Sequence, residues 1–171
     1  MKRICLILTV LLPVLLSACN GQMGEVITQA DTTTDTQKTA VGYGFTADSG
    51  LRLGVGMPMD EAADKLGLPQ SVQTSESCAF GGTDRAYAYP GFQVCTNDES
   101  GREQIYEITL TDDMYSTQEG IRVGTDTKQV TAIYGPSQGV DDALLCYRKD
   151  GMRLLFVIRD GVVSAIRYTA L

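Results

Sequence analysis

Residues 55–69 read VGMPMDEAADKLGLP and residues 123–136 read VGTDTKQVTAIYGP. Each stretch opens on Val-Gly and closes around a second glycine, and both glycines recur after an offset of 68 residues. Apolar residues between the glycines follow helical spacing, Pro58 suits a first helical position, and Gly67 and Gly135 suit helix ends. The two stretches therefore predict two short helices that open related halves of one domain.

Each predicted helix is followed by segments in which polar and apolar residues alternate, separated by short turns. Such turns favour antiparallel meanders. The predicted strands are Ser77–Phe80, Arg85–Tyr89, Phe92–Thr96 and Gln104–Thr111 in the first half, and Leu144–Arg148, Arg153–Arg159 and Val163–Thr169 in the second. The predicted fold class is α+β, with two tandem helix–β-meander repeats (about 51–111 and 119–171) forming one antiparallel sheet that carries both helices on one face.

The N-terminal residues have the pattern of a lipoprotein signal. Lys2 and Arg3 precede an apolar run, Ile4 to Leu16, that is too short to cross about 30 Å of hydrocarbon. The following Leu-Ser-Ala-Cys resembles the bacterial lipobox, whose cysteine receives a diacylglycerol and becomes the mature N-terminus. The resemblance implies a signal peptide at 1–18 and a protein anchored through diacylglyceryl-Cys19 to the outer side of the cell membrane. The alternative is an ordinary secretory signal in which Cys19 is incidental.

Residues 19–50 are rich in Thr, Asp, Gln and Gly and contain few large apolar residues. Such a stretch buries too little apolar surface to offset its ordering entropy, which predicts a flexible linker. The folded domain is then expected at 51–171.

Composition narrows the function classes. The 171 residues include 14 Lys and Arg, 21 Asp and Glu, and no His, for a net charge of −7. The acidic balance argues against a nucleic-acid partner, and the missing histidine removes the usual general base and the commonest metal ligand. Residues 135–139 match G-x-S-x-G, but a predicted helix precedes the serine where a nucleophile elbow needs a strand. The sequence predicts a protein with no enzymatic activity, cofactor or metal.

The cysteines leave two alternatives open. Cys78 and Cys146 share the 68-residue offset, so a disulfide between the halves is conceivable outside the cytoplasm. The alternative is that both, together with Cys95, are buried free thiols.

One predicted strand suggests a binding surface. Residues 85–89 read RAYAY, so alternation places the arginine and both tyrosines on one face and the alanines on the other. If the helices cover the alanine side, the open sheet face carries residues of types enriched in binding hot spots: Arg85, Tyr87, Tyr89, Arg153 and Arg167. The alternative is a tyrosine-bearing strand that simply packs.

The two helix–meander halves resemble the β-lactamase-inhibitor-protein-like fold, a tandem repeat of helices and antiparallel sheet, and one half also resembles BamE-like outer-membrane assembly lipoproteins. More narrowly, residues 77–92, 117–121 and 160–168 resemble a group of clostridial lipoproteins that brings no known activity. The chain departs from the inhibitor family because neither half has a cysteine pair and there is no tryptophan. The resemblance implies the fold, and inhibition of a β-lactamase would follow by analogy alone.

The sequence therefore predicts a membrane-anchored extracytoplasmic lipoprotein that binds another protein through its open sheet face. Two alternatives are a structural lipoprotein of envelope assembly and a module that binds small molecules or cell-wall fragments.

Overall fold

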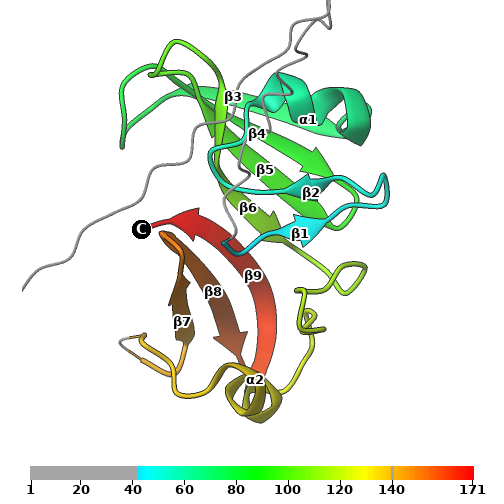
Figure 1. Cartoon of the computed structure of the whole chain (residues 1–171), viewed down its shortest axis with the longest axis vertical. Coiled ribbons are helices and arrows are strands. Elements are labelled where there is room, and N and C mark those ends of the chain that lie inside the picture. The colour runs from blue at the N-terminus through cyan, green and yellow to red at the C-terminus, as the bar shows by residue number, and fades with distance from the viewer. Residues whose placement is uncertain (1–41, 140) are drawn as a thin grey trace, which may run out of the picture. The chain divides into compact units, whose positions relative to one another are not determined.

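A long antiparallel sheet dominates the computed structural model, which describes residues 42–139 and 141–171 (Figure 1). The signal peptide, Cys19 and most of the predicted linker lie outside the described residues. Within the described part the elements are β1 (Phe45–Thr46), β2 (Arg52–Leu53), α1 (Met59–Leu66), β3 (Ser71–Glu76), β4 (Thr83–Tyr89), β5 (Phe92–Asn97), β6 (Gln104–Leu110), α2 (Thr127–Tyr134), β7 (Leu144–Lys149), β8 (Met152–Arg159) and β9 (Val162–Ala170).

The main sheet has seven strands in the order β3-β4-β5-β6-β9-β8-β7, and every neighbouring pair is antiparallel. Two meanders are joined where β6 pairs with β9, with Ile108 beside Tyr168 and Leu110 beside Ile166. β1 and β2 form a separate two-stranded hairpin. Sheet and helices together give the α+β architecture that the sequence predicts.

Both predicted helices are confirmed, and they start 68 residues apart. α1 begins after Pro58, and its end is marked by Gly67 at a φ of 73°. α2 begins after Asp126, whose side chain accepts a hydrogen bond from the Lys128 N–H at 2.8 Å. This contact satisfies one of the free N–H groups of the first helical turn. Neither helix has the length and apolar character that a membrane crossing requires.

One face of the sheet carries the core. Two rows of paired residues cross it: Tyr87, Val94, Ile108, Tyr168, Leu154 and Tyr147, and then Tyr89, Phe92, Leu110, Ile166, Phe156 and Leu145. α1 adds Met59 and Ala62 to this core, and α2 adds Val130. Burial of these apolar side chains against one sheet face is the main stabilising contribution.

The packed unit also includes β1, which lies before the predicted start of the domain at residue 51. Phe45 is only 2% exposed. Its ring centroid lies 4.9 Å from that of Phe92 and 5.4 Å from that of Tyr115. This stretch thus enters the core through Phe45 and the buried Ala47, and Tyr43 packs against that core.

The predicted strand at Ser77–Phe80 is wrong. These residues belong to the turn between β3 and β4, and the strand before that turn is Ser71–Glu76. All six residues of β3 are exposed. An edge strand that buries neither face needs no alternation of apolar residues, so it leaves no periodic signal.

Candidate functional site

A groove of about 470 Å³ lies between α1 and β4 on the helix-bearing face. Its lining includes Met59 and Ala63 from α1, Leu68 from the turn that follows, and Tyr87 and Tyr89 from β4. Leu68 is 96% exposed, the highest value among the exposed large hydrophobic side chains of the described residues. The groove therefore combines an aromatic floor with an apolar residue in solvent.

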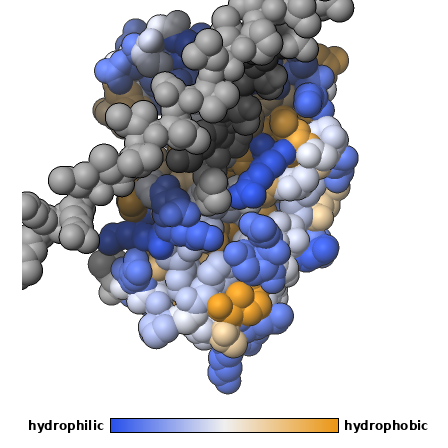
Figure 2. Space-filling model, in the orientation of Figure 1, coloured by the Kyte–Doolittle hydropathy of each residue, from blue (hydrophilic) through white to orange (hydrophobic). Residues whose placement is uncertain are grey.

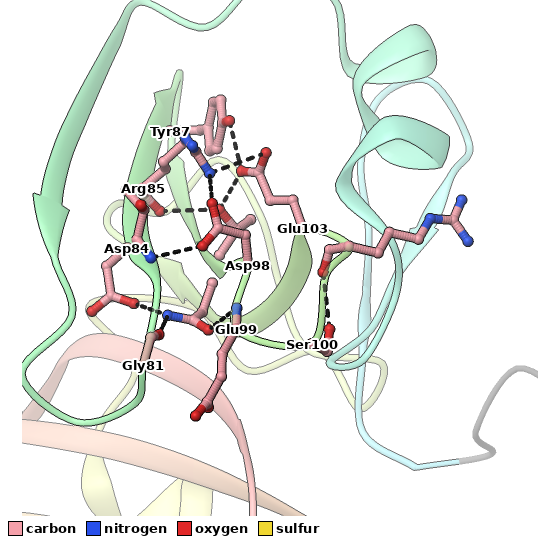
Figure 3. Close-up of polar contacts among 12 residues, drawn as sticks. Gly81, Asp84, Arg85, Tyr87, Asp98, Glu99, Ser100 and Glu103 are labelled. Carbon is pink, nitrogen blue, oxygen red and sulfur yellow. Dashed lines mark hydrogen bonds and ion pairs between the residues drawn. The ribbon is translucent and has the colours of Figure 1, made fainter.

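A cluster of polar contacts holds the tyrosine of the groove floor in place (Figure 3). The Tyr87 hydroxyl donates to Glu103 Oε1 at 2.7 Å, and the buried Thr96 hydroxyl donates to the same oxygen. Arg85 Nη1 lies 3.0 Å from Asp98 Oδ2 and 3.6 Å from Glu103 Oε2. The two carboxylates come from the segment that links β5 to β6, so this segment is fastened to β4.

The environment fixes the protonation of this cluster. Burial, and secondly the hydrogen bond to Glu103, raises the pKa of Tyr87 to about 12. The Thr83 N–H, and secondly the Arg85 guanidinium, lowers the pKa of Asp98. At neutral pH this cluster thus contains a neutral Tyr87 phenol, held by its own hydrogen bond, and an ionised Asp98 carboxylate.

The rim of the groove is charged. Arg102 Nη2 lies 2.9 Å from Asp60 Oδ1 and 3.0 Å from Glu61 Oε1, both at the start of α1. The Arg102 and Asp60 side chains are well exposed, so water screens this contact and its effect on stability is small. Its role is to bring the turn before β6 to the first turn of the helix.

Tyr89 lines the groove, but most of its side chain is packed in the core. It is 6% exposed, and its ring stacks on Phe92 at 4.9 Å between centroids with an interplanar angle of 11°. Any substitution of Tyr89 therefore disturbs the core as well as the groove.

The sheet brings together only part of the predicted binding set. Arg85, Tyr87 and Tyr89 lie on the helix-bearing face beside the groove. Arg153 and Arg167 lie on the opposite face, where Arg167 pairs with Glu107 and Arg153 Nε donates to the Ala170 carbonyl at 3.0 Å. The predicted set is thus divided between the two faces of the sheet.

The predicted placement of the tyrosines on the open face is wrong, and the pairing register shows why. Tyr87 stands opposite Val94, which is fully buried, whereas Ala86 stands opposite the half-buried Cys95. Alternation separates a strand's faces but does not say which face is covered. The alanines of β4 belong to the open face.

Among the groove residues that sequence reasoning did not assign to a site are Leu68, Arg102 and Glu103. Leu68 had a readable signal, because it lies between the helix-ending Gly67 and Pro69, where no regular element would bury it. Arg102 and Glu103 lie in a turn, and only the tertiary fold brings them to α1 and β4.

The three cysteines of the described residues are free thiols: Cys78 is exposed, Cys95 is half-buried and Cys146 is buried. Cys78 lies in the β3–β4 turn and Cys146 in β7, at opposite edges of the sheet, so the considered disulfide between them is not formed. Residues 42–139 and 141–171 contain no group of three or more Cys, Asp or Glu side chains able to hold a metal ion.

The helix-bearing side is predominantly hydrophilic where it is visible, with hydrophobic residues in small separate patches (Figure 2).

Comparison with protein families, curated proteins and solved structures finds no match to this chain.

Proposed function

We propose that this chain is an extracytoplasmic lipoprotein, held on the membrane through diacylglyceryl-Cys19, whose folded domain binds another protein without catalysing a reaction. The lipobox-like Leu-Ser-Ala-Cys motif supports the anchor and the location outside the cytoplasm. The binding surface is the groove between α1 and β4 rather than the open sheet face.

One observation carries this proposal: the groove joins an exposed leucine to a tyrosine held rigid by its neighbours. Leu68 is 96% exposed, and the Tyr87 hydroxyl is fixed by Glu103 at 2.7 Å. Aromatic anchors that are already ordered lose little conformational entropy on binding, which favours their use as contact residues.

The proposal extends to the fold, which we assign to the β-lactamase-inhibitor-protein-like tandem repeat. Support comes from matching contacts in the two halves. The Gly56 N–H donates to the Ile105 carbonyl at 2.7 Å, and the Gly124 N–H donates to the Val163 carbonyl at 2.7 Å. Each contact ties the start of a helix to the last strand of its own meander. The activity of that family is not carried over, since a shared fold does not determine function.

The experiment is affinity capture with the full tagged chain in detergent, from membranes and secreted fractions of the producing bacterium. Leu68→Asp alters the groove at an exposed position, and Arg153→Ala is the matched surface change on the open face. We expect a partner that is retained by the unmodified chain and by Arg153→Ala and is lost with Leu68→Asp. A partner lost only with Arg153→Ala would move the interface to the open face, and no specific partner would contradict protein binding.

A second candidate function is the binding of a small molecule or cell-wall fragment in the same groove. The volume of about 470 Å³ falls in the range of roughly 300–1,000 Å³ typical of ligand sites. A ligand of this kind raises the unfolding temperature of the chain, and Ala63→Arg, which places a long side chain in the groove, should remove that shift.

A further inference from the structure

β3 is an unprotected edge of the main sheet. It is the terminal strand, pairs only with β4, and has all six residues exposed. Its one charged residue is Glu76 at the end, and its sequence, SVQTSE, contains no lysine or proline. Edge strands commonly carry such residues, or a cover, because their free N–H and C=O groups accept further strands. None of these protections is found on β3 among the described residues.

The opposite edge of the sheet is covered. The segment after α2 runs beside β7, where the Gln138 N–H donates to the Cys146 carbonyl at 2.9 Å. The Cys146 N–H in turn donates to Ser137 Oγ at 3.0 Å. β7 also ends on Arg148 and Lys149. The two edges of one sheet thus differ, and within residues 42–139 and 141–171 it is the β3 edge that is left free to pair.

The free edge adjoins the groove. Val72 is the partner of Tyr87 in the β3–β4 register, so it points to the helix-bearing face, and it is 47% exposed. A strand added beside β3 would place every second side chain on that face, next to Val72 and near the exposed Leu68. Apolar residues at those positions would cover both.

The negative charge around the β3 edge favours a basic segment as the strand that pairs with it. Residues 42–111 contain four Lys and Arg and ten Asp and Glu, a net charge of −6, whereas residues 112–171 contain seven and eight, a net charge of −1. Glu76 ends β3 itself, and Asp60 and Asp64 line the groove beside it. A second copy of the chain would bring the same acidic half against this edge, whereas a basic segment is attracted to it.

We infer that an extended basic segment of a partner protein, with apolar residues at alternate positions, adds to β3 as an eighth strand. Main-chain hydrogen bonds to β3 provide the affinity, and the apolar residues beside Val72 and Leu68 provide the selectivity. This inference rests on the proposed protein-binding function and names the chemistry of its partner.

The test starts from a random-peptide library displayed on phage and selected on the full chain in detergent. We expect enriched peptides that alternate apolar with Lys or Arg residues. A synthetic peptide of the enriched sequence should then slow amide hydrogen exchange at residues 71–76. Such protection reports new main-chain hydrogen bonds, which binding in the groove alone would not provide.

Two lysine variants test on which face of the sheet the added strand makes its side-chain contacts. Val72→Lys and Gln73→Lys introduce the same charge at adjacent exposed positions, but on opposite faces of the sheet. We expect Val72→Lys to weaken peptide binding by about tenfold or more, and Gln73→Lys to weaken it by no more than about threefold. Amide exchange of β4 in the free variants checks that the sheet is intact.

Four results would overturn the inference. Peptides that bind without slowing amide exchange in β3, or whose affinity falls equally with both variants, would show that no strand is added to β3. Protein binding as such would still stand. Recovery of no alternating basic peptide would remove the stated partner chemistry, while membrane capture decides separately whether a protein is bound. Dimerisation that Val72→Lys abolishes, seen by sedimentation, would assign the edge to a second copy.

Discussion

Phe45→Ala tests whether the residues before position 51 belong to the folded unit. Phe45 lies on β1 at 2% exposure, and its ring contacts the rings of Phe92 and Tyr115 edge-on. Its centroid also lies 6.5 Å from that of Tyr168. If residues 42–50 were only a linker, the substitution would leave the free energy of unfolding unchanged.

The expected loss of unfolding free energy follows from the burial of the Phe45 side chain. A buried phenylalanine removes roughly 150–250 Å² of surface from water, which at about 25 cal/mol per Å² is worth roughly 4–6 kcal/mol as an upper bound. Truncation of buried phenylalanines typically costs about 3–5 kcal/mol, with a further share from the cavity left behind. We therefore expect a loss near 4 kcal/mol, about a quarter or more of the stability of an ordinary domain.

The assay is equilibrium urea unfolding of the full chain in detergent, followed by tyrosine fluorescence and circular dichroism. Thr46→Ala is the control, because Thr46 is the exposed neighbour of Phe45 on the same strand. Its unfolding free energy should change by less than about 0.5 kcal/mol. A loss below about 1 kcal/mol for Phe45→Ala would show that β1 does not pack in solution as described, and would return the start of the domain to residue 51.

Three further predictions concern local features. The Thr83 N–H, and secondly the Arg85 guanidinium, lowers the pKa of Asp98. Ionised Asp98 therefore stabilises the fold above its unfolded pKa of about 3.9, and this contribution is lost as pH falls through the lowered folded pKa. Asp98→Asn should accordingly lower stability at neutral pH, and it should weaken the dependence of stability on pH in the acid range. An unchanged dependence on pH would contradict the contacts of Asp98. Asp126→Ala should lower the unfolding free energy by about 1 kcal/mol, since the first turn of α2 loses its cap, and an unchanged urea midpoint would show that the cap is not formed. Gly91 and Gly101 both have positive φ, but a Cβ added at Gly91 would lie 2.8 Å from Asp112 Oδ1, whereas one added at Gly101 would have no atom within 4 Å. Gly91→Ala should therefore destabilise the fold by at least about 1 kcal/mol more than Gly101→Ala. Equal losses in urea unfolding would refute the clash.

The sequence predicted the elements that bury one regular face. Met59, Ala62 and Leu66 recur at helical spacing, and α1 spans the residues between Pro58 and Gly67. Six of the seven predicted strands overlap strands of the sheet. Burial alternates along β5 and most of β8, whereas β7 has three consecutive buried residues and β4 is half-buried up to Tyr89. β3 escaped prediction because it is exposed throughout, and β1 because two residues are too few to show a period.

The candidate site was only partly predictable, for a different physical reason. The spacing in RAYAY correctly grouped Arg85, Tyr87 and Tyr89 on one face, but the choice of face depends on what stands opposite. Tyr87 faces the helix side because its partner Val94 is buried, and this register is a property of two strands. The acidic partner Glu103 comes from a turn, whose place beside β4 follows from the fold alone.

The two halves differ in the segment that follows each helix, and the proposed interface lies there. α1 and α2 are tied in the same way to β6 and β9, through Gly56 and Gly124. After α1, residues 67–82 include a full strand whose outer edge no described residue covers. After α2, Ser137 and Gln138 make hydrogen bonds to Cys146 at the outer edge of β7. A bare edge is an aggregation hazard that a cover of the second kind would remove. Its presence in only the acidic half is what a surface used for pairing with a basic partner requires, and a purely structural repeat gives no reason for the difference.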